Sequence, residues 1–272
     1  MKTVRLNKET EIPVLGLGTW KLNGEECVEA VAEAISIGYR HIDTADAYEN
    51  HAEVREGIRK SGIGREDLFL TTKLHFDDGY KEETVRKSGE RLLKELDTDY
   101  VDLLLIHWPD RSTSFEETLH AMDELKKAGK ARALGVSNFT IHHLEDALKA
   151  GVEITDNQVE IHPAFTQKEL RDFCALKKIA VTAYSPLGRK HVLELPLLHE
   201  LADKYEKTPA QIALNWIVSR GMITIPKSAN PQRIKENFDS LSFSIEEPDL
   251  VRIDEIPQEE RIVAPAYSDF DY

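Results

Sequence analysis

Eight short apolar runs recur along the chain, and nearly all of them end in a side chain that can act chemically. The runs end near Gly18, Asp43, Lys73, His107, Ser137, Gln158, Tyr184 and Lys227. Spacings of about 20 to 45 residues leave room for one helix each, because a crossover between parallel strands needs a dozen residues or more. Eight strand-and-helix repeats in 272 residues predict an α/β fold, a (β/α)8 TIM barrel formed by residues 1–272 as a single domain.

The hydrophobic pattern favours this barrel over its main alternative. The run Leu103–Ile106 is apolar at every position, as expected of a strand buried on both faces. A doubly wound open sheet alternates the same elements. Its dinucleotide fingerprint needs three glycines on a strand-to-helix turn, however, and no third glycine follows Gly16 and Gly18 at the required spacing.

Helix signals lie between the runs, and a hairpin signal precedes them. Ser114 with Glu117, and Thr208 with Gln211, have the spacing of capping boxes at helix starts. The opening stretch alternates apolar and polar residues around the polar turn 7–10. It predicts a short N-terminal β-hairpin before the first barrel strand, placed at the floor of the barrel.

Composition limits the possible partners. The net charge of −14 argues against a general nucleic-acid surface. No apolar run approaches the ~20 residues that span a bilayer, and no signal-like segment follows Met1, so we expect a cytoplasmic protein without a membrane partner. Cys27 and Cys174 lack metal-ligand spacing and are expected as buried, reduced thiols. We expect a monomer, with weak homo-oligomerisation as the alternative.

Four run-end or adjacent residues, Asp43, Tyr48, Lys73 and His107, predict an acid site. In a barrel the carboxyl ends of the strands face one pocket. A phenol with a pKa near ~10 donates a proton poorly unless a neighbour stabilises the phenolate, and Lys73 can do so. Asp43 would compensate the buried ammonium, and His107 would orient a carbonyl oxygen. Taken singly, each has a simpler interpretation, such as an ordinary buried ion pair; their shared position favours chemistry.

A second group predicts an anion site at a late strand end. Lys227 and Ser228 end a strand, Asn230 can cap the next helix, Pro231 suits its first position, and Arg233 lies in its first turn. Free helical N–H groups, a hydroxyl and two cations attract phosphate, and late-strand loops of barrels often hold one. The alternative is a capped helix with solvated charges.

Polar side chains between the two groups could seat a nicotinamide. Asn138 and Gln158 offer paired donors and acceptors for a carboxamide, and Tyr184 offers a flat aromatic face. Alternatively, the amides satisfy loop backbone and Tyr184 packs inside the barrel. We predict no metal site, and we expect the adjacent His142 and His143 at the surface of a helix start.

These motifs, in this order, resemble the aldo-keto reductase family over nearly the whole chain. They are GLGTW (16–20), DTADAY (43–48), TTK (71–73), LLLIHWP (103–109), GVSNF (135–139), NQVEIHP (157–163), YSPLG (184–188), IPKS (225–228) and RIKEN (233–237). The resemblance implies an NADPH-dependent carbonyl reductase acting on a small-molecule aldehyde or ketone. It makes Tyr48 the proton donor, Asp43 and Lys73 the residues that tune it, and His107 the residue that positions the carbonyl.

The resemblance also implies the binding residues. The cofactor would be held by Gly18, Thr19, Trp20, Ser137, Asn138, Gln158, Tyr184, Ser185, Leu187, Lys227, Ser228, Arg233, Glu236 and Asn237. Among these, Ser185 and Leu187 would follow the pyrophosphate, Lys227, Ser228 and Arg233 the 2′-phosphate, and Glu236 with Asn237 the adenine. The substrate pocket would be walled by Trp20, Phe76 and Trp108.

The chain departs from the family pattern at two places. His51 follows Asn50 where the family often has Glu, and His75–Phe76 stands where many small members have Trp. Its short loop after Pro109 is similar to that of compact microbial members such as 2,5-diketo-D-gluconate reductases. The tail 264–272 is interpreted either as frayed or as a flap near the barrel mouth.

Two other classes of function stay open. A non-catalytic nucleotide-binding sensor would keep the cofactor site, but it would not need the complete acid set. A metal-dependent barrel hydrolase would need a ligand pair such as His-x-His, which the sequence does not contain.

Overall fold

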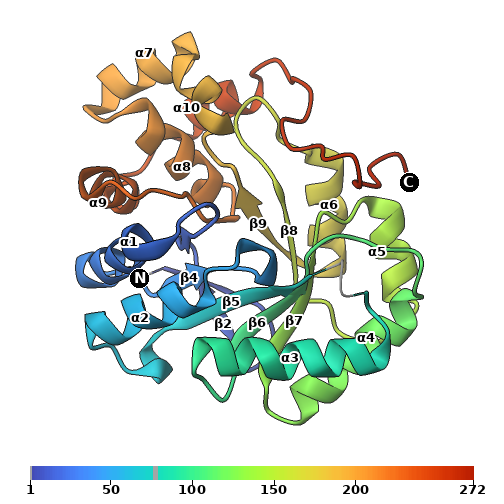
Figure 1. The fold of residues 1–272 in the computed structure, drawn as a ribbon. Helices are drawn as coiled ribbons and strands as arrows, with labels where there is room; N and C mark the ends of the chain where they lie inside the picture. The colour runs from blue at the N-terminus through green and yellow to red at the C-terminus, as the bar shows by residue number, and fades with distance from the viewer. Residues whose placement is uncertain (1, 76–78) are drawn as a thin grey trace.

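The computed structural model describes residues 2–75 and 79–272, and eight parallel strands form its central sheet. Their order in the sheet is their order in the sequence. A bridge between Leu15 and Thr224 brings the first and last strands together, which closes the sheet into the predicted (β/α)8 barrel. Figure 1 shows the helices arranged around its strands. The strands are β3 (Leu17–Gly18), β4 (His41–Asp43), β5 (Phe69–Leu74), β6 (Val101–Ile106), β7 (Ala131–Ser137), β8 (Asp156–Glu160), β9 (Ala180–Tyr184) and β10 (Ile223–Thr224).

Helices surround the sheet and follow its strands in turn. They are α1 (Gly24–Ile37), α2 (His51–Ser61), α3 (Glu82–Leu96), α4 (Phe115–Lys127), α5 (Ile141–Leu148), α6 (Lys168–Lys177), α7 (Pro196–Tyr205), α8 (Pro209–Ser219), α9 (Pro231–Asp239) and α10 (Glu247–Asp254). Thr208 and Gln211 form the predicted capping box. In the other predicted box, the Ser114 hydroxyl accepts the N–H of Glu117 as expected. The Glu117 side chain accepts the N–H of Glu82 rather than that of Ser114, so this half of the prediction is wrong.

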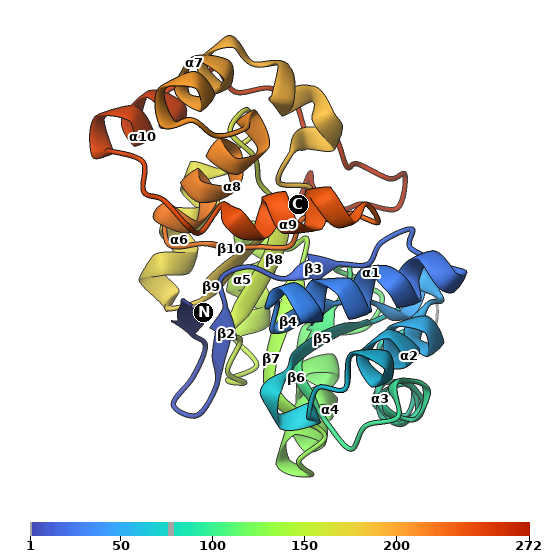
Figure 2. The ribbon, with the colours of Figure 1, turned by 90° about the vertical axis from the view of Figure 1, so that its left-hand side faces the viewer.

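The predicted hairpin is present. Strands β1 (Thr3–Arg5) and β2 (Glu11–Pro13) pair antiparallel. The hairpin's Leu6 and Ile12 pack against Phe69 and Ile223, the first residues of β5 and β10. Since these are amino ends of strands, the hairpin covers the floor of the barrel, away from the C-terminal segment (Figure 2).

Side chains inside the barrel change from apolar at the floor to polar toward the mouth. Above the floor, His41 pairs with the hydroxyl of Thr71 at 3.1 Å, and the Thr182 hydroxyl donates to Asp156 at 2.8 Å. Residues two apart on a strand point to the same face, so the strands that bury these groups carry Asp43, Lys73, Gln158 and Tyr184 one step higher. The alternation of each strand therefore brings the run-end residues to one mouth.

Two findings concern features expected from composition. Cys27 and Cys174 are buried and free of disulfides, as predicted. No helix in residues 2–75 and 79–272 combines the length and apolar character needed to cross a bilayer.

Candidate active site

A buried ammonium organises the acid end of the site. The Nζ of Lys73 donates to Asp43 Oδ1 at 2.5 Å, to the Thr44 carbonyl at 2.9 Å and to the Tyr48 oxygen at 3.3 Å. Gln158 donates its amide to the other oxygen of Asp43 at 2.7 Å. The three N–H groups of Lys73 thus bind a carboxylate, a carbonyl and the phenol, which fixes the phenol relative to the positive charge.

Burial and charge oppose each other in this group. Burial disfavours the ammonium of Lys73, but Asp43 and Tyr48 together raise its pKa above the ordinary value. Burial raises the pKa of Tyr48 above its ordinary value, although the Lys73 charge acts to lower it. Burial also raises the pKa of Asp43, although Lys73 and Gln158 act to lower it. With the proton on Lys73, the phenol is neutral and has a cation beside its oxygen.

His107 completes the acid end as a neutral imidazole. Its ring lies edge to face with that of Tyr48, with 5.7 Å between centroids. Burial lowers the His107 pKa well below the ordinary value, and the charges of Lys73 and His75 add to this. Its buried Nδ1 has no hydrogen-bond partner in the part of the chain that the structure describes.

The residues expected around a carboxamide bind one another. Asn138 donates to the His107 carbonyl at 3.0 Å and to Ser137 Oγ at 3.1 Å, and accepts from the Tyr184 hydroxyl at 2.7 Å. Ser137 donates to the Gln158 carbonyl at 2.8 Å. Asn138 holds a left-handed backbone, φ 66°, directly after β7. That strained conformation is typical of ligand sites.

The predicted anion end is open to solvent. Asn230 caps α9 by accepting the N–H of Arg233 at 3.0 Å, and Ser228 Oγ accepts the N–H of Asn230 at 3.1 Å. Lys227 and Arg233 are exposed, and neither forms an ion pair with any described residue. Within the described chain these two cations therefore lie beside a helix N-terminus with no ion-pair partner.

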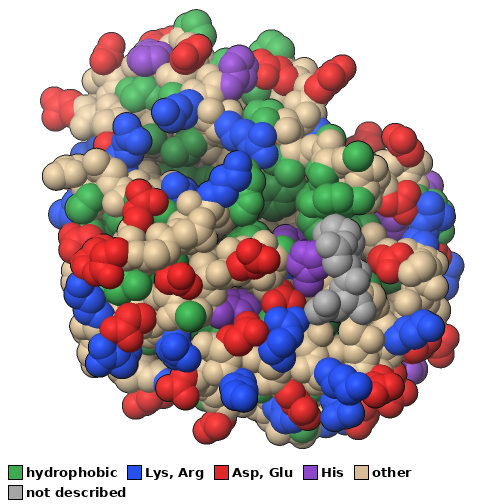
Figure 3. All heavy atoms as spheres, in the orientation of Figure 1, with side chains coloured by type: hydrophobic (Ala, Val, Ile, Leu, Met, Phe, Trp, Pro, Cys, Tyr) green, Lys and Arg blue, Asp and Glu red, His purple; other side chains and the backbone are tan. Residues whose placement is uncertain are grey.

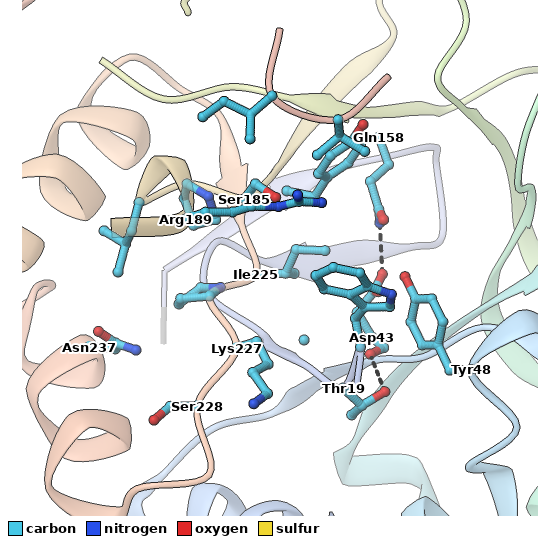
Figure 4. Close-up of a pocket in the computed structure, with 18 of the residues that line it drawn as sticks. Thr19, Asp43, Tyr48, Gln158, Ser185, Arg189, Ile225, Lys227, Ser228 and Asn237 are labelled. Atoms are coloured by element: carbon cyan, nitrogen blue, oxygen red, sulfur yellow. Dashed lines mark hydrogen bonds between the residues drawn. The ribbon is translucent and has the colours of Figure 1, made fainter. Parts of the chain in front are cut away.

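One cleft of about 1480 Å³ joins the two ends. Figure 3 shows it as a hollow lined by hydrophobic side chains with Lys and Arg beside them, and Figure 4 places Lys227, Ser228 and Asn237 across from Tyr48. Of the site residues expected from the sequence, all the described ones line this cleft except Lys73, which lies fully buried behind Asp43 and Tyr48. Phe76 lies outside the described residues.

Comparison with known proteins places the chain in a family. The model of the aldo/keto reductase family matches residues 14–258. The chain belongs to the aldo/keto reductase family. It is 45% identical to a glyoxal reductase of Bacillus subtilis over 96% of this chain and 94% of that protein. It is also 40% identical to the methylglyoxal reductase DkgA of Escherichia coli K12, over 95% and 94%.

Solved structures of the family share the fold. An aldo/keto reductase from Brucella melitensis has a TM-score of 0.90 and 46% identity, over 94% of this chain and 99% of that one. The aldo-keto reductase MGS-M4, from a deep-sea metagenome library, has a TM-score of 0.94 and 37% identity, over 98% and 100%. Family membership and the relatives support an oxidoreductase that acts on carbonyl groups with a nicotinamide cofactor.

Sequence patterns missed two basic residues of the reductase cleft. Arg189 and Lys190 follow β9 in left-handed conformations, with φ of 48° and 83°, and line the cleft. The Arg189 guanidinium lies 5.3 Å from the Trp20 ring centroid, so it reaches across the opening. The rule that late-strand loops of barrels bind phosphate could have found both.

The C-terminal segment forms one side of the cleft. Residues 262–265 and Tyr267 line it, so of the two interpretations left open by the sequence, the structure favours a flap near the mouth over a frayed tail. Buried Glu160 accepts the N–H groups of Ile262 and Val263, both at 2.9 Å. His143 is buried rather than on the surface as expected, because its ring packs against Phe115, Phe139 and Tyr272. It also pairs with Asp269 of the tail at 3.1 Å.

Proposed function

We propose that this protein reduces small aldehydes or ketones to alcohols with NADPH, and that Tyr48 is the proton donor. The geometry of one contact carries the proposal: the Tyr48 oxygen lies 3.3 Å from the Lys73 ammonium, which is paired with Asp43. This group lies at one end of a cleft whose other end presents Lys227 and Arg233. An acid at one end and a phosphate-binding surface at the other suit a phosphorylated redox cofactor.

The donor set of the cleft fits NADPH. Lys227, Ser228 and Arg233 at the start of α9 suit the 2′-phosphate, with Glu236 and Asn237 toward the adenine. Ser185 and Leu187 suit the pyrophosphate, and Arg189 adds a cation there. Ser137, Asn138 and Gln158 would hold the carboxamide, Tyr184 would stack on the ring, and Gly18, Thr19 and Trp20 would line the near wall.

The chain's own residues handle the carbonyl oxygen. The bound cofactor supplies a hydride to the carbonyl carbon. Neutral His107 and the Tyr48 hydroxyl lie together and would hold the oxygen between them. Tyr48 donates its proton as negative charge builds on the oxygen, and the Lys73 ammonium stabilises the phenolate left behind. Asp43 keeps that ammonium charged and in place.

Aromatic side chains and the named relatives favour small substrates. Trp20, Trp108 and Tyr267 line the opening, and Tyr267 lies edge to face on Trp108 at 5.3 Å between centroids. These faces suit a compact, largely apolar substrate body above the polar acid group. The relatives named as reductases of glyoxal and methylglyoxal make short dicarbonyls the first candidates.

Steady-state oxidation of NADPH with a panel of aldehydes, in wild type and Tyr48→Phe, tests the proposal. We expect kcat to fall by about 10³-fold in Tyr48→Phe, because the proton donor is lost, with NADPH affinity kept. Fluorescence titration of NADPH in both proteins is the control. Tight NADPH binding by the wild type without turnover of any aldehyde would instead indicate a nucleotide sensor.

A further inference from the structure

A chain of polar contacts lies behind the acid end, outside the barrel wall. It contains Asp46, Arg91, Glu95, His51 and Thr72, which we call the brace. Arg91 binds both oxygens of Asp46, at 2.7 and 2.6 Å, and reaches Glu95 at 3.3 Å. Glu95 contacts His51 Nδ1 at 2.8 Å, and His51 Nε2 contacts Thr72 Oγ1 at 3.0 Å.

The two ends of the brace adjoin two residues of the acid group. Asp46 begins the short 3-10 turn η1 (Asp46–Tyr48), which carries the phenol. Thr72 precedes Lys73 on β5, so its side chain points to the outer face of the strand while Lys73 points into the barrel. The brace therefore ties the turn that carries the phenol and the strand that carries the ammonium to the same helix, α3.

The bonding pattern of His51 suits a brace rather than a metal site. Asp46, His51 and Glu95 are close enough to ligate an ion. Both Asp46 oxygens, however, accept hydrogen bonds from Arg91. Both ring nitrogens of His51 are also hydrogen-bonded, one to Glu95 and one to Thr72. Burial lowers the pKa of His51 against the opposing effect of Glu95, which fits a neutral ring that donates to Glu95 and accepts from Thr72.

The turn needs such an anchor because its own bonds are few. Two backbone contacts close it, from Tyr48 N–H to Ala45 and from Glu49 N–H to Asp46, both at 3.0 Å. Glu49 then adopts a left-handed conformation, φ 54°. Asn50 ties the far end of the turn to the carbonyls of Thr19 and Leu22. Asp46 is the matching tie at the near end, and a bidentate guanidinium fixes both its position and its direction.

We propose that the brace is a set of positioning residues that holds the Tyr48 hydroxyl at the Lys73 ammonium, with Arg91 as its centre. This inference rests on the proposed reductase function. Arg91 is not among the described residues that line the cleft, and it acts by fixing Asp46 and Glu95. A displacement of about 1 Å at a reacting group can cost about 10²-fold in rate, so a loose turn would reduce turnover without weakening binding.

The test replaces Arg91 with Met and, separately, Asp46 with Asn. We expect kcat to fall about 10-fold or more in each, with KM for the aldehyde and the NADPH dissociation constant within about twofold of wild type. The double variant should lose no more than Arg91→Met alone, because Asp46 acts through its pair with Arg91. Arg91→Lys should recover only part of the rate, since an ammonium cannot bind both oxygens in a fork.

Arg86→Met is the matched control, because Arg86 lies on the same helix and pairs only with exposed Glu90 among the described residues. Its kcat should equal that of wild type. Equal kcat in Arg91→Met and Arg86→Met would overturn the proposal, even if Arg91→Met melts at a lower temperature.

Amide hydrogen exchange separates this inference from the function on which it rests. Residues 44–50 should exchange faster in Arg91→Met than in Arg86→Met, whatever the activity. Wild type without turnover would contradict the reductase function and leave this exchange difference intact. Unchanged exchange in 44–50 would contradict the brace itself.

Discussion

The two ends of the cleft differ in how far their bonds are made in advance. At the acid end, Asp43, Lys73 and Gln158 are fully buried or nearly so and bind one another. At the anion end, Lys227 and Arg233 stand in solvent without ion-pair partners among the described residues. Charge that develops during a reaction is best stabilised by groups already fixed in place, whereas a cofactor that must enter and leave needs groups it can reach.

The same difference governs how solvent acts on each end. Charges at the anion end are screened by salt within about 10 Å at ordinary ionic strength, whereas buried pairs are screened far less. Substitutions at the acid end should therefore change kcat and stability together. Substitutions at the anion end should change cofactor affinity alone.

The largest expected effect is that of Lys73→Met, which removes the ammonium and keeps a similar volume. We expect kcat to fall about 10³-fold and stability to fall by about 3 kcal/mol, because Asp43 is left buried without its partner. The double variant Asp43→Asn/Lys73→Met should recover most of the stability but none of the rate. Urea unfolding and single-turnover kinetics measure the two effects; recovery of both would mean that the pair is only structural.

The second prediction compares Asp43 with another buried carboxyl in the same barrel. Asp156 accepts from Thr182, but its Oδ2 has no partner among the described residues, and burial raises its pKa from 3.8 to about 8. Between these two pH values the folded protein holds a proton that the unfolded chain has released. The contribution of Asp156 to stability therefore falls as pH rises, by up to about 1.4 kcal/mol per pH unit.

Asp156→Asn removes that slope. The variant should gain about 2 kcal/mol relative to wild type on going from pH 5.5 to 7.5, measured by urea unfolding at both pH values. Parallel stability curves for the two proteins would mean that Asp156 is ionised despite its burial. The ionisation of Asp43 would then depend less on the Lys73 charge than the comparison of the two carboxyls suggests.

The contrast between the ends also explains what the sequence could predict. The acid and anion residues lie at the ends of apolar runs, and the barrel brings all such ends to one mouth, so their convergence follows from periodicity alone. Cap signals at Thr208 and Asn230 are equally local, and both caps form as predicted. Contacts between neighbours in the chain were therefore predicted well, and the one that failed, the Glu117 half of the Ser114 box, failed because Glu117 binds the distant N–H of Glu82.

Contacts between distant segments were not predictable in this way. The tail docks because Glu160 accepts two of its N–H groups and because Asp269 binds His143 and Arg111. Nothing in the residues near His143 indicates a partner more than a hundred positions away, so the sequence suggested a surface histidine. Such pairings depend on the path of an irregular segment, which has no periodicity to reveal it.

A smaller effect is expected at the anion end, for Arg233→Ala. The NADPH dissociation constant should rise about 10-fold and that for NADH should stay within about twofold, because only NADPH carries the 2′-phosphate. Lys235→Ala is the matched control, since Lys235 lies on the same helix but is paired with Asp239. Equal effects on NADPH and NADH would show that Arg233 does not contact the 2′-phosphate. With saturating NADPH, kcat should not change.

The smallest effect is expected where the tail meets the opening, for Tyr267→Ala. Tyr267 is 53% exposed and contacts Trp108 through one ring edge, so the loss removes part of an apolar wall and little buried surface. We expect KM for the aldehyde to rise about threefold, while kcat and NADPH affinity stay at wild-type values. Leu176→Ala, at another exposed apolar side chain, should change none of the three. A fall in kcat at Tyr267 would mean that the tail also acts on the Tyr48 hydroxyl, and the acid end would then include a residue of the tail.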